Sequence, residues 1–113
     1  MTRAEQLFEQ MAARLLGRPN VSQGTGFGSN PGLRVGGKVF AMLNRGALVV
    51  KLPKERVDQL VASGAGSRFD PRRDGRLMKE WVTVPAGRGR EWGTLADEAL
   101  TFVASAAAKA RRR

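Results

Sequence analysis

The chain has 113 residues, 42% of them hydrophobic, which is enough for one globular domain with a modest core. It contains no cysteine and no histidine, so disulfides, thiolate metal sites and the commonest general base at neutral pH are excluded. Twenty Lys and Arg against ten Asp and Glu give a net charge of +10, which favours polyanionic partners.

The first element predicted is an amphipathic helix over residues 2–16. Thr2 and Glu5 have the spacing of a capping box, and the segment 17–20 (Gly-Arg-Pro-Asn) ends the helix. Two acids in the first nine residues and the lack of an apolar segment argue against a secretory signal. No run is long enough to span a membrane, so we expect a cytoplasmic protein.

Residues 22–32 form a polar, glycine-rich connection. The glycine spacing differs from that of the dinucleotide fingerprint and the P-loop, and no helix is predicted after it. Without a helix N-terminus behind the glycines, we do not expect a phosphate cradle here. The segment is interpreted as a loop or as an edge strand with bulges.

Three strands are predicted next, over 33–35, 38–43 and 47–52, with tight turns at 36–37 and 44–46. They form a three-stranded antiparallel meander. The middle strand is apolar on both faces, which indicates that the sheet is covered on both sides or that its second face is an interface.

Pro53 begins a second helix that extends to Ser63. Residues 64–76 are predicted as a loop, 77–84 as a fourth strand and 91–108 as a long final helix. The predicted order is α-β-β-β-α-β-α, an α+β fold with helices packed on an antiparallel sheet.

We expect a single domain over residues 1–108, followed by a basic tail at 109–113. Trp81 and Phe40 are interpreted as core residues rather than platforms for base stacking. The serines have no neighbouring base in the sequence, so no catalytic residue, cofactor or metal is predicted.

Three segments resemble a known family. Residues 32–43 (GLRVGGKVFAML) resemble a hairpin of the TfoX N-terminal domain and the related MmcQ/YjbR-like proteins, and residues 48–53 fit it too. Residues 75–84 (GRLMKEWVTV) are similar to a later strand of that family. The resemblance implies an α+β fold with a double-wing sheet and DNA binding or transcription-related regulation. It brings no catalytic residues.

Basic residues of the predicted hairpins and of the region after the second helix form the candidate nucleic-acid-binding set. The set is Arg34, Lys38, Arg45, Lys51, Arg72, Arg73, Arg76 and Lys79. Residues 21–51 contain four of these cations and no acid. Lys38 and Arg45 occupy turns, where a wing that enters a groove would need them.

Other interpretations of these cations stay open. They could serve only solubility, Arg76 and Lys79 could pair with Asp74 or Glu80, and Lys51 could pair with an acid on a covered face.

The function expected is that of a small non-enzymatic protein that binds duplex DNA or another polyanion weakly through backbone phosphates. The chain has no tyrosine and lacks the interleaved aromatics of single-strand binders. The alternative is a protein-interaction or homodimerisation module, suggested by the apolar strand at 39–43 and the alanine-rich final helix. A small-ligand pocket between sheet and helices is a third possibility.

Overall fold

The computed structural model describes residues 2–25, 30–69 and 78–111. The elements in chain order are α1 (Arg3–Leu15), β1 (Val21–Thr25), β2 (Pro31–Val35), β3 (Lys38–Asn44), β4 (Ala47–Lys51), α2 (Lys54–Ala62), β5 (Ser67–Phe69), β6 (Met78–Pro85), the short 3₁₀ turn η1 (Ala86–Arg88) and α3 (Gly89–Arg111). The last residues of α3 include part of the segment expected to form a basic tail.

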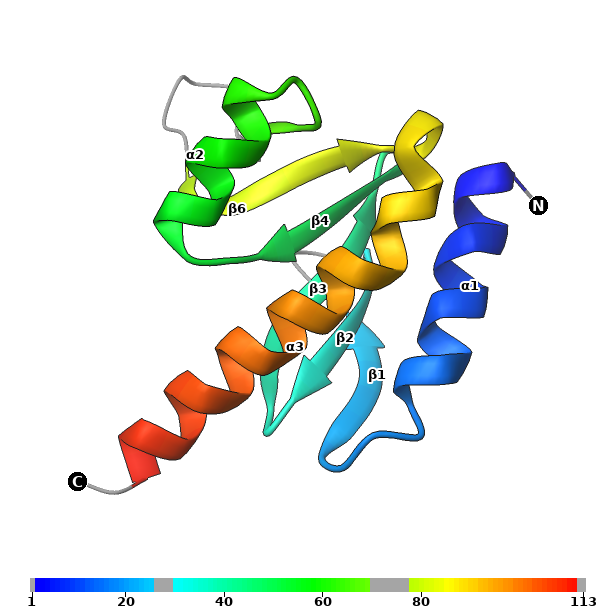
Figure 1. Cartoon of the computed structure of the whole chain (residues 1–113). Coiled ribbons are helices and arrows are strands. Elements are labelled where there is room, and N and C mark those ends of the chain that lie inside the picture. The colour runs from blue at the N-terminus through cyan, green and yellow to red at the C-terminus, as the bar shows by residue number, and fades with distance from the viewer. Residues whose placement is uncertain (1, 26–29, 70–77, 112–113) are drawn as a thin grey trace.

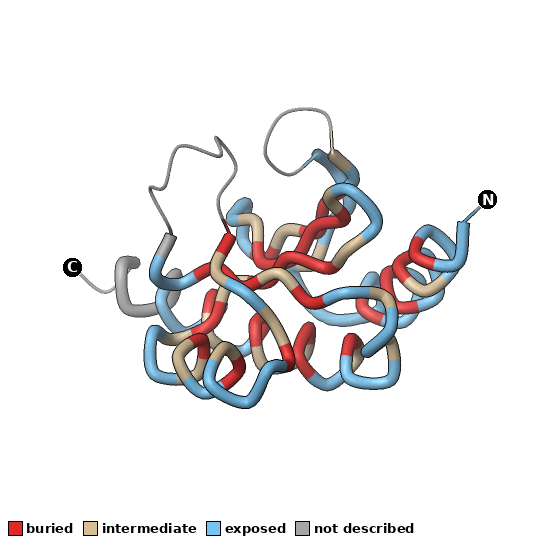
Figure 2. Tube along the Cα trace, turned by 90° about the horizontal axis from the view of Figure 1, so that it is seen from above, coloured by how far each residue is buried: buried red, intermediate tan, exposed pale blue. Residues whose placement is uncertain are grey.

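The described strands form one antiparallel sheet in the order β1-β2-β3-β4-β6-β5. All three helices lie on the same side of it, with α3 crossing the centre, α1 beside β1–β3 and α2 over β6 (Figure 1). Seen along the sheet, the helices form a single layer below the strands (Figure 2). The predicted α+β class is therefore confirmed.

Two strands, β1 and β5, were missed when residues 22–32 and 64–76 were interpreted mainly as connections. Both lie at the edges of the sheet. In β1 only Val21 packs against the core and the next four residues are exposed, so the strand has no apolar alternation. β5 has three residues, too few to form a pattern. The edge-strand alternative for the glycine-rich segment is confirmed over residues 21–25.

The capping box of α1 forms as predicted. The Thr2 hydroxyl accepts a hydrogen bond from the Glu5 backbone at 3.1 Å, and the Glu5 carboxylate accepts one from the Thr2 backbone at 3.0 Å. The bond from the Thr2 backbone is the largest cause that lowers the pKa of the Glu5 carboxyl.

A β-bulge at Phe40 changes the alternation of β3. Leu33 pairs with Ala41 while Arg34 pairs with Val39, so Phe40 is the extra residue. A bulge residue bends its strand and interrupts the two-residue period. As a result Phe40 and Ala41, although adjacent, both belong to the core beneath the helices.

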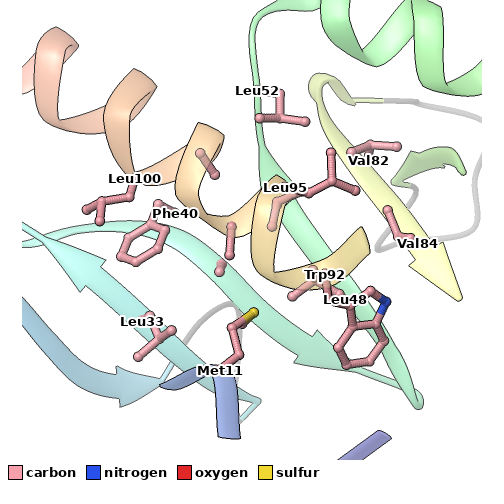
Figure 3. Packing of buried hydrophobic residues seen from close by; sticks show 14 of the residues in the cluster. Met11, Leu33, Phe40, Leu48, Leu52, Val82, Val84, Trp92, Leu95 and Leu100 are labelled. Carbon is pink, nitrogen blue, oxygen red and sulfur yellow. The ribbon is translucent and has the colours of Figure 1, made fainter. Parts of the chain in front are cut away.

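The main core fills the space between the helices and the sheet (Figure 3). Trp92 of α3 is 1% exposed there, and its indole N–H donates to the Pro85 carbonyl at 3.2 Å. Such a large aromatic residue, buried with its polar atom paired, anchors the helix to the end of β6. Phe40 is fully buried in the same core, which confirms its interpretation as a core residue.

A second, smaller apolar cluster lies on the opposite side of the sheet. It consists of Met42, Val49, Phe69 and Trp81, with Val39 packed against it. Met42 is fully buried and Trp81 is 7% exposed. The central strands are thus buried on both faces, as their sequence indicated, and the core interpretation of Trp81 is confirmed.

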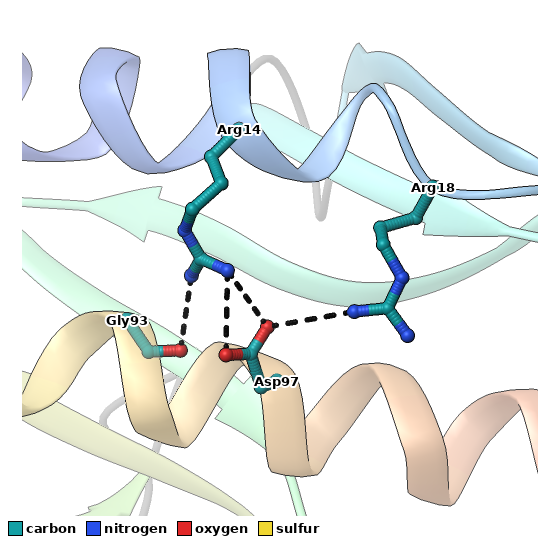
Figure 4. Close-up of polar contacts among 4 residues, drawn as sticks. All are labelled: Arg14, Arg18, Gly93 and Asp97. Carbon is teal, nitrogen blue, oxygen red and sulfur yellow. Dashed lines mark hydrogen bonds and ion pairs between the residues drawn. The ribbon is translucent and has the colours of Figure 1, made fainter.

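Ion pairs join the helices to one another and to β5. Arg14 of α1 lies 3.1 Å from Asp97 of α3 and also donates to the Gly93 carbonyl, and Arg18 lies 3.9 Å from the same carboxylate (Figure 4). Arg56 of α2 contacts Glu98 of α3 at 2.9 Å.

Asp58 of α2 accepts hydrogen bonds from Lys54 and from Arg68 of β5. The bond from Lys54 is the largest cause that lowers the pKa of the Asp58 carboxyl.

Candidate nucleic-acid interface

No helix among the described residues lies on the sheet face that carries the second cluster, and we call this face the helix-free side (Figure 2). Strand residues that alternate with main-core residues point toward it. Lys51, for example, lies between Val50 and Leu52, both fully buried in the main core, and it pairs across the strands with Trp81 of the second cluster.

Four of the eight candidate cations lie on the helix-free side. Arg34 stands between the core residues Leu33 and Val35, so it faces this side as Lys51 does. Lys79 precedes Trp81 by two positions in β6 and shares its face. Arg45, in the β3–β4 turn at φ 51°, lines a hollow that opens on the same side.

Of the remaining four candidates, one lies on the other side of the sheet and three are not described. Lys38 pairs with Val35, a main-core residue, so its side chain starts from the helix side of the sheet. The bulge at Phe40 is the reason: the extra residue interrupts the two-residue alternation of β3, so the faces predicted for Lys38 and for the residues after Phe40 no longer follow one pattern. Arg72, Arg73 and Arg76 lie outside the described residues.

The acids are distributed differently from the cations. Seven of the eight Asp and Glu in the described residues lie on helices, and the eighth is Glu80 in β6. Alternation with Val82, a main-core residue, places Glu80 toward the helix side. Among the described residues, then, the helix-free side carries basic side chains and no acid.

The cations of the helix-free side, unlike several cations of the helix layer, lack ion pairs with described residues. Arg45, Lys51 and Lys79 make no ion pair with any described residue. The alternatives in which Lys51 or Lys79 pairs with an acid therefore gain no support from the described part of the chain.

Arg34 is held by backbone carbonyls rather than by an acid. Its guanidinium donates to Thr25 at 2.9 Å and to Gly37 at 3.4 Å. The Arg34 side chain passes over Gly24 of β1: a Cβ added to this glycine would lie 3.6 Å from the Arg34 Nε. The guanidinium is thus fixed across β1 with its full positive charge, because the carbonyl groups that hold it are neutral.

The spacing of these charges suits an extended anion. Arg45 lies in the turn before β4 and Lys51 ends the strand, whose five residues span about 13 Å at about 3.3 Å per residue. One strand of duplex DNA places a phosphate about every 3.4 Å along the axis, so the strand corresponds to about four nucleotides.

The hollow beside Arg45 was not predicted. It measures about 310 Å³ and is lined by Asn44, Arg45, Ala47, Ser67, Arg68, Phe69 and Thr83. Its polar residues come from three strands that are far apart in the sequence, and no motif marks them.

The described part of the chain offers no group of three or more acids that could hold a metal ion. Nor is any of its helices long and apolar enough to cross a membrane.

These features define a small α+β protein with one helix layer on an antiparallel sheet and an opposite face on which the described charged side chains are all basic. A family model described as YjbR matches residues 16–101, which is most of the chain, and the chain belongs to the YjbR family. The resemblance to MmcQ/YjbR-like proteins is thereby confirmed. Searches of curated proteins and of solved structures gave no match.

Proposed function

We propose that this protein binds duplex nucleic acid weakly through backbone phosphates, using the helix-free side of its sheet. The observation that carries the proposal is the separation of charge: the described acids lie on or toward the helix layer, while Arg34, Arg45, Lys51 and Lys79 share the opposite face. A phosphate backbone approaching that face is attracted by these cations and meets no carboxylate of the described residues there.

The same face supports duplex rather than single-strand binding. Single-strand binders stack bases on exposed aromatic rings, whereas Trp81 and Phe69 are 7% and 5% exposed. Contacts of Arg and Lys with phosphates fix position without reading bases. We expect weak, sequence-independent affinity, with a Kd on the order of 10⁻⁴ to 10⁻⁶ M at physiological salt.

Fluorescence anisotropy with a labelled DNA duplex, repeated over a salt series, tests this proposal. The variant R45E/K79E reverses two exposed charges on the helix-free side. The matched control R3E/R90E makes the same change in net charge at two exposed arginines of α1 and α3 that have no ion-pair partner among the described residues.

The parent should bind at low salt and lose affinity steeply as salt rises. Each lost phosphate contact removes about 0.9 from the slope of log K against log salt, so R45E/K79E should lower that slope by about two. The control should keep most of it. No binding of the parent at low salt, or equal weakening in both variants, would contradict the proposal.

Homodimerisation is the competing proposal. The apolar strand at 39–43, one of the two features that suggested it, is largely buried within the single chain. The one large hydrophobic residue exposed among the described residues is Leu16, at 38%. An interface would thus have to be largely polar. Light scattering across a concentration series separates the two: a rising mass would favour the dimer, and a constant monomer mass would count against it.

No catalytic role is assigned to any residue of this face, and we propose that the protein is not an enzyme.

A further inference from the structure

The hollow at the β3–β4 turn includes a small residue at the start of a central strand. Ala47, the first residue of β4, contributes only a methyl group; it pairs with Asn44 of β3 and with Pro85 of β6, and Thr83 lies two positions before Pro85 in β6. Ser67 pairs with Thr83 across β5 and β6. Cross-strand partners place their Cβ atoms about 5 Å apart, so the two hydroxyls lie on adjacent positions of one wall.

The polar groups around the hollow are not committed elsewhere. The side chains of Asn44, Ser67 and Thr83 form no hydrogen bond with any described residue. All three can donate a hydrogen bond, as can the guanidinium of Arg45. None of the described residues that line the hollow carries a carboxylate.

The two arginines of the hollow differ in availability. Arg68 is bonded through its guanidinium to Asp58 of α2, on the helix side of the sheet. Arg45 is exposed and has no ion-pair partner among the described residues. The turn holds Arg45 in the left-handed region at φ 51°, which fixes the position of its backbone at the rim.

We infer that this hollow binds one phosphate group, with Arg45 supplying the charge and the paired residues Ser67 and Thr83 supplying neutral hydroxyl donors. Asn44 lies three strands away from Ser67, at the opposite wall of the hollow. Donors from two adjacent hydroxyls and one guanidinium can reach different oxygens of a phosphate, and the bonds to a charged acceptor are the strong ones. The inference deepens the proposed function and rests on it for the source of the phosphate, a nucleic-acid backbone.

The apolar wall favours a phosphate over a base. Phe69 is 5% exposed and so offers too little ring surface for stacking. Recognition by donors alone needs only the phosphate and tolerates any base.

The test is a titration followed by two-dimensional amide NMR of the full chain, with four probes: a DNA duplex, thymidine 5′-monophosphate, inorganic phosphate, and thymidine, which lacks the phosphate. The duplex, the nucleotide and inorganic phosphate should shift the backbone amides of Asn44, Arg45, Ser67 and Thr83, whereas thymidine should leave them in place.

The variant S67A/T83V removes both hydroxyls. Valine is nearly isosteric with threonine and favours strands, so the sheet should be retained. The control T94V/S105A makes the same chemical changes at two exposed positions of α3. We expect S67A/T83V to weaken binding of the nucleotide and the duplex about five- to tenfold and the control to leave both unchanged. R45Q, which retains hydrogen-bond donors but lacks the charge, provides a second variant if S67A/T83V loses its NMR dispersion.

The outcomes separate this inference from the proposed function. If the duplex binds with parental affinity to both S67A/T83V and R45Q, the phosphate site is refuted and the proposed function stands. If the duplex does not bind but inorganic phosphate and the nucleotide shift the amides of the hollow, the site stands and binds free phosphates, while the proposed function fails. If thymidine shifts the same amides, the hollow recognises a nucleoside and the inference is overturned.

Discussion

The exchange of Gly66 for alanine tests how closely β5 is packed on β6. Gly66 immediately precedes β5, and a Cβ built on it would lie 2.7 Å from the Thr83 carbonyl oxygen and 2.9 Å from a methyl group of Val82. The carbonyl belongs to the backbone of β6, so it cannot yield as a side chain does. Gly66→Ala therefore requires β5 to move away from its partner strand.

The expected magnitude follows from two opposing effects. Overpacking of this kind costs about 1–3 kcal/mol, and replacing glycine by alanine recovers about 0.4–1 kcal/mol of unfolded-state entropy. The free energy of unfolding should fall by about 1–2 kcal/mol. Gly87→Ala is the matched control, because nothing lies within 4 Å of the added Cβ, and it should be neutral or slightly stabilising. Gly89→Ala should fall between them, since its Cβ would meet only the end of the Leu7 side chain, at 2.6 Å.

Urea unfolding followed by tryptophan fluorescence measures the difference, because Trp81 and Trp92 are both buried. With a urea m-value of about 1–3 kcal/mol per molar, the midpoint of Gly66→Ala should lie roughly 1 M below that of Gly87→Ala. Equal midpoints with equal m-values would show that β5 yields freely and would refute this account of the close approach.

The same urea assay tests predictions for four further variants. Phe40→Ala should cost about 3–5 kcal/mol, since it empties a fully buried site at the bulge, and a loss below about 1 kcal/mol would contradict that packing. Thr2→Ala should cost about 1 kcal/mol by removing the helix cap, with a matching fall in helical circular dichroism. Asp97→Ala should cost less than about 1 kcal/mol, because the carboxylate is 43% exposed and its ion pairs are screened. Because the pKa of the Asp58 carboxyl is lowered in the folded state, its contribution to the free energy of unfolding is present above the ordinary carboxyl pKa and is lost as the pH falls through the folded-state value. Asp58→Asn should therefore lose less stability on acidification than the parent. Parallel profiles of stability against pH would contradict this.

The central part of the fold could be predicted because its elements have clear periods. The helices α1 and α3 show apolar residues at helical spacing, and the strands around 38–44 and 47–51 are apolar between glycine-containing turns. The edge strands could not be predicted, since β1 buries only part of one residue against the core and β5 is three residues long. Their pairing with β2 and β6 supplies hydrogen bonds that no local pattern shows.

The candidate site could be predicted only in part. The acid-free hairpin region correctly indicated cations on the sheet, but which face each cation occupies depends on register. One bulge residue, Phe40, separates Lys38 from Arg34 and Lys51, and a bulge cannot be recognised in an apolar run. Residues of the hollow such as Asn44 and Thr83 are brought together by strand order, and short polar side chains in strands give no signal of their own.

The ion pairs of the helix layer explain why the excess charge becomes concentrated on the sheet. Asp97 and Glu98 are used to join α3 to α1 and α2, and Asp58 joins α2 to β5, so these acids are held where helices meet their neighbours. Among the described residues, no helix or further strand lies over the helix-free side, and no acid lies there. An anion near the helices meets carboxylates well within a screening length of about 10 Å, whereas the described charged side chains on the opposite face are all cations. Binding should therefore depend on where charge is removed rather than on how much, which is why R45E/K79E and R3E/R90E, equal in net charge, should behave differently.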